Sequence, residues 1–143
     1  MRLIIVFFIF FSFLACKNNA EEIPPSIYGI GPYEKLTLDP INDSIMKIGM
    51  ETFKQKCSSC HTMEYKNSGP DLSDVLSRRQ PEWIMNYFMN YEEMLQKDSI
   101  TIKTNQKYDE NCSFELHQQE AFAILEYFRI YQIWLHEFNA KPV

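Results

Sequence analysis

Residues 57–61 read Cys57-Ser58-Ser59-Cys60-His61, and this run decides how the chain is interpreted. C-x-x-C-H is the attachment site of a c-type haem. Each thiol forms a thioether to one of two neighbouring vinyl groups of the macrocycle, and one helical turn holds two side chains about that far apart. The histidine that follows brings its imidazole under the ring, where it ligates the iron. Cys57, Cys60 and His61 are therefore the predicted haem-binding residues, and one covalent haem c is the predicted cofactor.

Two other kinds of site also use paired cysteines. A thioredoxin-like redox pair usually sits near a βαβ pattern, and the sequence shows no such pattern. A zinc site needs a second pair of Cys or His at ligand spacing, and Cys112, His117 and His136 do not form one. Haem attachment is the interpretation that the motif favours.

The first sixteen residues have the features of an export signal. Arg2 supplies a positive n-region, and residues 3–14 are apolar except for Ser12. A run of this length is too short to span a bilayer and is typical of a signal peptide. It ends in Ala15-Cys16, which resembles a bacterial lipobox. We expect residues 1–15 to be removed and Cys16 to be lipidated; the alternative is an ordinary secretory signal with a chance cysteine.

Export and lipidation predict where the protein works. Two or more acyl chains anchor a protein stably to a membrane surface, which places this chain on the periplasmic side of a bacterial membrane. Export also agrees with the haem motif, because c-type haem is attached outside the cytoplasm. Of the four cysteines, one is assigned to the lipid and two to the haem, so Cys112 is left without a disulfide partner.

The mature chain divides into a linker, residues 16–40, and one small domain, residues 41–140. The linker holds four prolines and two glycines and has no helical or alternating period,. It is either an extended spacer, a disordered segment, or a segment whose later part packs on the domain through Tyr28, Tyr33, Leu36 and Leu38. The net charge of −5 is mild and interspersed, so a nucleic-acid-binding face is excluded.

Apolar residues at helical spacing predict three helices, and no strand is evident. The first runs from about residue 43 into the haem motif, the second starts at Pro81, and the third runs from about 118 to 138. The expected apolar face of the first helix consists of Ile45, Ile48, Thr52 and Phe53. Residues 99–108 are ambiguous because they contain poor helix formers. The predicted fold class is all-α, a small helical domain wrapped around one haem.

Here the sequence resembles the class I cytochrome c family over most of residues 45–131. Gly49 and Phe53 stand eight and four residues before Cys57, as they do in that family. The resemblance implies that Gly49 lets the first helix cross closely against an aromatic side chain of the last helix. Tyr127 is the candidate for that aromatic partner.

A second match follows the haem motif, at Gly69-Pro70-Asp71-Leu72. The resemblance implies that the carbonyl of Pro70 accepts a hydrogen bond from the far nitrogen of His61. Contacts of this kind fix the tautomer of a ligating histidine and raise its basicity. Trp83 is expected either near a haem propionate or as an ordinary core tryptophan.

The chain departs from the family at the sixth iron ligand. Class I cytochromes usually carry a methionine shortly before the last helix, and this chain has Asn111 and Cys112 there. Met94 has the right chemistry but comes early in the chain, and a Cys112 thiolate would ligate strongly. His117 stands where a helix cap is expected. The sequence leaves these choices open, together with an iron that has no second protein ligand.

These observations predict an exported, monohaem c-type cytochrome that carries single electrons between membrane-side respiratory redox partners. No acid–base pair or nucleophile indicates an enzyme. Residues 83–98 resemble small cytochromes that accompany bacterial respiratory reductases, including nitrous oxide reductase. An open distal site would instead suit a haem-based sensor or scavenger of NO or CO, which is the alternative function.

Overall fold

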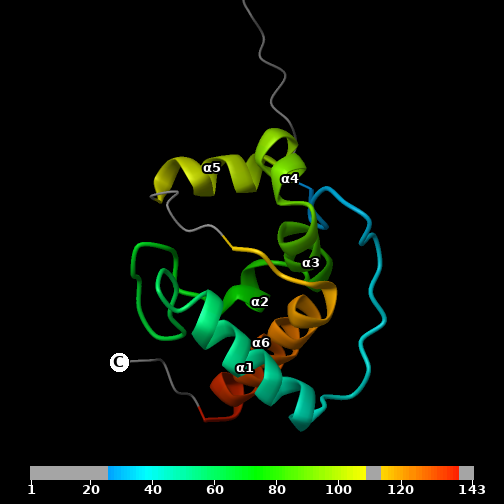
Figure 1. Ribbon diagram of the computed structural model, residues 1–143, viewed down its shortest axis with the longest axis vertical. Helices are drawn as coiled ribbons and strands as arrows, with labels where there is room; N and C mark the ends of the chain where they lie inside the picture. The colour runs from blue at the N-terminus through cyan, green and yellow to red at the C-terminus, as the bar shows by residue number, and fades with distance from the viewer. Residues whose placement is uncertain (1–25, 109–113, 139–143) are drawn as a thin grey trace, which may run out of the picture.

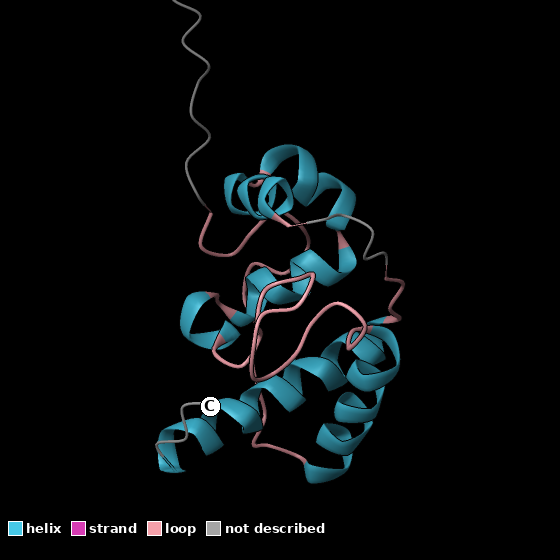
Figure 2. Cartoon of the chain, turned by 90° about the vertical axis from the view of Figure 1, so that its left-hand side faces the viewer, coloured by secondary structure: helices cyan, strands magenta, loops and turns pink. Residues whose placement is uncertain are grey.

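Helices are the only regular secondary structure in residues 26–108 and 114–138, the parts of the chain that the computed structural model describes. They are α1 (Asp43–Lys56), α2 (Val75–Arg78), α3 (Pro81–Met89), α4 (Tyr91–Lys97), α5 (Ser99–Lys107) and α6 (Gln118–Phe138) (Figure 1). The helices α2 and α3 and several loops occupy the middle of the molecule, between the α4–α5 pair at one end and the α1–α6 pair at the other (Figure 2). The predicted all-α class is confirmed. Within the described residues, no helix is long and apolar enough to cross a membrane.

Helices α1 and α6 cross at Gly49. A Cβ atom added there would lie 1.8 Å from the carbonyl oxygen of Ala123 and 2.3 Å from its carbonyl carbon, so only glycine permits this approach. The predicted close crossing is confirmed, but its partner at Gly49 is the backbone of Ala123. Tyr127 packs instead on Phe53, one turn along α1, with ring centroids 5.7 Å apart.

The buried face of α1 is narrower than the sequence predicted. Gly49, Thr52 and Phe53 are buried, but Ile45 and Ile48 are 43% and 58% exposed, so the expectation for these two residues is wrong. Adjacent residues point about 100° apart on a helix, and Ile48 therefore lies beside the stripe that Gly49 presents to α6. Ile45 lies a full turn before the crossing, toward the N-terminal end of α1.

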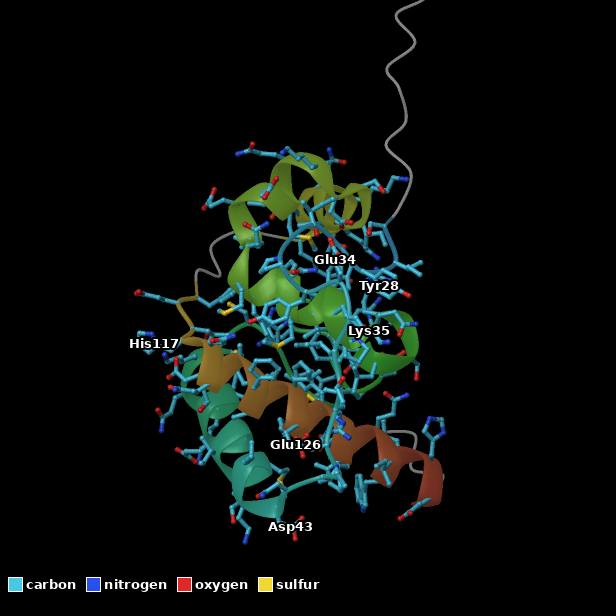
Figure 3. All side chains as sticks on the ribbon, turned by 90° about the vertical axis from the view of Figure 1, so that its right-hand side faces the viewer. Tyr28, Glu34, Lys35, Asp43, His117 and Glu126 are labelled. Atoms are coloured by element: carbon cyan, nitrogen blue, oxygen red, sulfur yellow. The ribbon has the colours of Figure 1, made fainter. Side chains whose placement is uncertain are left out.

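Asn42 caps α1. Its side chain accepts hydrogen bonds from the backbone N–H groups of Ser44 and Ile45, which would otherwise have no partner within the helix. The backbone N–H of Asn42 donates to the carboxylate of Glu126 at 2.7 Å. Figure 3 shows Glu126 on α6. Arg129 pairs with the same Glu126 carboxylate at 2.6 Å. The start of α1 is therefore fixed to α6 by hydrogen bonds as well as by packing.

Residues 26–42 pack on the helices. Asn86 on α3, 1% exposed, donates through Nδ2 to the carbonyls of Tyr28 and Tyr33 and accepts from the N–H of Tyr33. The N–H of Ile30 donates to Sδ of Met94 at 2.9 Å. Three further side chains pack against the core, namely Tyr33, Leu36 and Leu38. The folded unit therefore includes residues 26–40, which the sequence assigned to the linker.

Two glycines allow this segment to lie so close to α3 and α4. Gly29 has φ 74°, a conformation that other residues rarely adopt. A Cβ atom at Gly29 would lie 2.9 Å from Cε of Met94, and one at Gly31 would lie 2.4 Å from Oδ1 of Asn86. The backbone thus reaches contacts that a side chain would block.

The ambiguous residues 99–108 form α5. Asp98 caps this helix, because its Oδ1 accepts from the N–H of Thr101 at 2.7 Å and from its hydroxyl at 2.8 Å. Asp98 and Thr101 are each 1% exposed. A buried cap of this kind outweighs the poor helix propensity of the segment.

Candidate haem-binding site

His61 is held by the loop that follows the motif. Its Nδ1 lies 2.9 Å from the carbonyl oxygen of Pro70. A carbonyl oxygen only accepts, so Nδ1 carries the proton and donates, which leaves the lone pair of Nε2 for a metal ion. The hydrogen bond that the resemblance implied is therefore present, and it presents the nitrogen that a haem iron needs.

Gly69 leaves the space in which the imidazole of His61 lies. A Cβ atom at Gly69 would lie 2.4 Å from Cε1 and 2.6 Å from Nδ1 of the ring. The loop is tied to the motif itself, because the N–H of Gly69 donates to the carbonyl of Cys60 at 2.8 Å and that of Leu72 to Thr62 at 2.9 Å. The ring of His61 is thus fixed by one hydrogen bond and by close packing.

The two cysteines follow the end of α1. Cys57 is its C-cap, and its carbonyl accepts from the N–H groups of Cys60 and His61 at 3.1 and 2.9 Å, which turns the chain back on itself. Cys57 is a free thiol, and burial raises its pKa to about 11, against a smaller opposite effect of Lys56.

Cys60 differs from the sequence-based expectation, because the structure records it in a disulfide bond. The cysteine count had left no pair for a disulfide. A thioether to haem would take the place of this bond, since one sulfur atom cannot form both.

A cavity of about 310 Å³ adjoins the His61 loop. His61 does not line it directly; Gly69 and Pro70, which contact the imidazole, do. The walls are mostly apolar and aromatic, as suits a flat macrocycle. The side chains from α3 and α6 are Trp83, Ile84, Tyr87, Phe88 and Phe128.

The polar groups of this cavity fit the carboxylates of a haem. Nε1 of Trp83 is buried and finds no hydrogen-bond partner among the described residues, although buried donors normally have one. Arg78 and Arg79 also line the cavity. The guanidinium of Arg79 lies 5.1 Å from the ring centroid of Trp83. Burial lowers the pKa of Arg79, and the charge of Arg78 lowers it further. An indole donor and two cations are suitable partners for the haem propionates, which favours the first of the two roles expected for Trp83.

The structure separates Met94 from the cavity. Met94 is fully buried, but it is absent from the cavity lining and its sulfur accepts the hydrogen bond from Ile30. Its position therefore favours a packing role. Of the other candidates, His117 is exposed at the start of α6 (Figure 3), and Asn111 and Cys112 lie outside the described residues.

Sequence reasoning missed a stack of aromatic rings along the cavity. Trp83 stacks on Tyr87 with centroids 5.2 Å apart and an interplanar angle of 19°. Tyr87 in turn stacks on Phe114 at 5.9 Å and 20°, and burial raises the pKa of its phenol. The four-residue spacing of Trp83 and Tyr87 was a signal for the first pair, whereas Phe114 comes from a distant part of the chain.

These features define a small helical protein built to hold a covalent haem through a C-x-x-C-H turn. The chain matches the family model of cytochrome c over residues 46–130, more than half of its length, and it belongs to that family. The class I fold expected from the sequence is confirmed. The cofactor is haem c, and Cys57 and Cys60 stand at the positions of the two attachment cysteines.

Solved structures of cytochromes c are similar to this chain in sequence and in fold. Cytochrome c from Rhodothermus marinus is 31% identical, with a TM-score of 0.68 over 75% of this chain and 94% of that one. An engineered form of that protein, Rma TDE, has a TM-score of 0.69 at the same identity, over 75% of this chain and 95% of that one. The same engineered protein bound to a carbene intermediate, 1-ethoxy-1-oxopropan-2-ylidene, has a TM-score of 0.67. No curated protein sequence matches the chain.

Proposed function

We propose that this protein carries single electrons between membrane-side respiratory partners, as an electron-transfer protein and not as an enzyme. Membership of the cytochrome c family supports haem-based electron transfer in general. The bound haem supplies an iron that gains and loses one electron, and Cys57, Cys60 and His61 are the residues that would hold it.

The observation that carries this proposal is the double restraint on His61. Electron transfer is favoured when the ligands of the metal move little between its two oxidation states. The hydrogen bond to Pro70 and the close packing against Gly69 together fix the orientation of the imidazole. The same hydrogen bond holds the proton on Nδ1 and keeps the lone pair of Nε2 for the iron, which favours a ligand that stays bound in both states.

The rest of the cavity serves the same function. Its aromatic and aliphatic side chains lower the local dielectric, which strengthens each interaction with a charge in the site. Trp83 and Arg79 would bind the propionates and keep the macrocycle in one orientation. The protein thus presents a mostly apolar cavity in which the cofactor can change its charge.

A spectroelectrochemical titration of the purified holoprotein tests this function. The visible spectrum should convert between the oxidised and reduced forms with fixed isosbestic points. The reduced fraction should follow a one-electron Nernst curve, and the oxidised spectrum should return fully on reoxidation. Repeated cycles with small inorganic electron donors and acceptors should leave the haem content unchanged. A haem that cannot be reduced reversibly would overturn the proposal.

We also propose that the protein is lipidated at Cys16 and works on the periplasmic side of a bacterial membrane. The support is the sequence alone, from the apolar run of residues 3–14 and the Ala15-Cys16 junction. The donor and acceptor would be components of a respiratory chain, and the support for this is the resemblance of residues 83–98 to cytochromes that accompany respiratory reductases.

A second candidate function is the haem-based sensing or scavenging of NO or CO. One observation favours it, because none of the six methionines in the described residues lines the cavity. An engineered relative is bound to a carbene intermediate, and by analogy the cavity of this chain is suited to a small ligand. CO binding to the reduced holoprotein, measured from the Soret band, separates this function from electron transfer alone.

A further inference from the structure

Residues 26–29 form a tight turn that carries two large apolar side chains at its tip. The N–H of Gly29 donates to the carbonyl of Ser26 at 3.4 Å, and the hydroxyl of Ser26 donates to the carbonyl of Gly29 at 2.9 Å. Serine at the first position and glycine at the fourth are common in turns. The two central residues are Ile27 and Tyr28, which are 63% and 44% exposed. Central turn positions usually hold small or polar residues, so this tip is unusually apolar.

The turn is held against α3, so its tip has a defined position. The carbonyl of Tyr28 accepts a hydrogen bond from Nδ2 of Asn86 at 2.8 Å, and Asn86 is buried. A Cβ atom at Gly29 would lie 3.1 Å from Cδ1 of Trp83, which lines the haem cavity. The turn therefore packs on the wall of the cavity, while Ile27 and Tyr28 remain exposed.

The place of this turn in the chain puts it next to the expected anchor. Residues 17–25 are the nine residues between Cys16 and Ser26. Fully extended, nine residues span roughly 30 Å, which is about the diameter of a small domain. Figure 3 shows Tyr28 beside α3, away from Asp43 at the start of α1. A chain anchored at Cys16 therefore keeps the side that carries the turn nearer to the membrane than the α1–α6 end.

We propose that Ile27 and Tyr28 dock on the lipid surface of the membrane that carries the anchor. The proposal rests on the membrane location proposed above, and it adds a face of the folded domain to the lipid at Cys16. Tyrosine is enriched at membrane–water interfaces, and isoleucine partitions favourably out of water. Two side chains alone would bind a lipid surface weakly, but a short tether makes the contact intramolecular and so raises its effective concentration. Docked in this way, the protein holds the Trp83 wall of the haem cavity close to the membrane.

Hydroxyl-radical footprinting of the oxidised holoprotein measures the exposure of individual side chains. The two samples are the lipidated protein in vesicles of phosphatidylethanolamine and phosphatidylglycerol, and the soluble Cys16→Ser protein. The oxidation rates of Ile27 and Tyr28 should fall about threefold or more on the vesicles, because side chains that insert at the interface are covered by lipid. Ile48 and Tyr65 are the matched controls, since they are 58% and 61% exposed. Their rates should be the same in both samples.

The variant Ile27→Ser tests the contact itself. Ile27 is exposed, so its replacement should leave thermal unfolding unchanged, but on vesicles the oxidation rate of Tyr28 should rise about twofold or more because half of the apolar contact is lost. Ile48→Ser, the same change on α1, should leave the rate of Tyr28 unchanged.

Three results would overturn the proposal. The first is an equal rate at Ile27 and Tyr28 on vesicles and in solution, and the second is an equal fall at these residues and at the two controls. The third is protection of the turn in the soluble sample that grows with protein concentration, which would identify a second copy of the chain as the occupant. If Cys16 carries no lipid, the Cys112→Ser protein is attached through the Cys16 thiol to a maleimide lipid. Docking of the turn and lipidation can therefore fail independently.

Discussion

Replacing Gly49 by alanine should destabilise the protein, although glycine to alanine in a helix interior ordinarily stabilises it by about 1 kcal/mol. The added Cβ atom would lie 1.8 Å from the carbonyl oxygen of Ala123. An ordinary van der Waals contact is near 3.5 Å, so α1 and α6 would have to separate by more than about 1.5 Å. The obstacle is backbone on both sides, and no rotamer change can relieve it.

The magnitude follows from the packing at the crossing. Overpacking a core costs typically about 1–3 kcal/mol, and occasionally more. Separation of the helices would also loosen Phe53, which is 5% exposed and packs on Tyr127 and Phe128. We expect a net loss of about 2 kcal/mol in the free energy of unfolding. For a domain of this size that corresponds to a fall in Tm of roughly 8–16 °C.

Thermal unfolding of the oxidised holoprotein, followed by far-ultraviolet circular dichroism, measures this change. Met50→Ala is the control, because Met50 is the next residue along α1 and is 47% exposed. It should alter the free energy of unfolding by less than about 0.5 kcal/mol. A Gly49→Ala protein with an unchanged or raised Tm would show that helix propensity outweighs packing and that the two helices do not meet at Gly49.

Three further predictions concern the site, the N-terminal segment and the membrane anchor. Gly69→Ala should displace the imidazole of His61 and weaken its hydrogen bond to Pro70, so the visible spectrum of the haem should differ from that of the wild type; an unaltered spectrum would contradict the packing. Asn86→Ala removes three hydrogen bonds to residues 28 and 33, and at about 1 kcal/mol each it should lower stability by about 3 kcal/mol and open residues 26–42 to limited proteolysis. If the protease cuts both proteins equally, the segment is not held by Asn86. Cys16→Ser should release the mature protein from the membrane fraction, and mass spectrometry of the wild type should find acyl chains on Cys16; an unmodified Cys16 would refute lipidation.

The parts of the site that sequence predicted are those that local backbone chemistry dictates. The C-x-x-C-H turn needs five consecutive residues. Gly49 is required because a side chain there would collide with the backbone of α6. The Gly69-Pro70 pair is required because the carbonyl of Pro70 must face His61. Such requirements restrict the residue at a single position, so the resemblance to class I cytochromes c could be recognised at these positions in one sequence.

The parts that sequence missed depend on contacts between distant residues. Asn86 is a polar residue in an apolar helix face, and nothing near it in the chain shows that residues 28 and 33 complete its hydrogen bonds. The exposure of Ile45 and Ile48 follows from the place where α6 crosses α1, at Gly49. Met94 had suitable chemistry for iron, and only the packed position of Ile30 shows that its sulfur is already engaged.

Covalent attachment of one haem at Cys57 and Cys60 is the claim on which the site and both proposed functions depend. Mass spectrometry of the denatured, reduced holoprotein after acid–acetone extraction tests it most directly. The polypeptide should carry the added mass of one haem, and digestion should place that mass on the peptide containing residues 57–61. The double variant Cys57→Ser, Cys60→Ser should lose it. A wild-type chain whose haem is removed completely by the extraction would contradict the account.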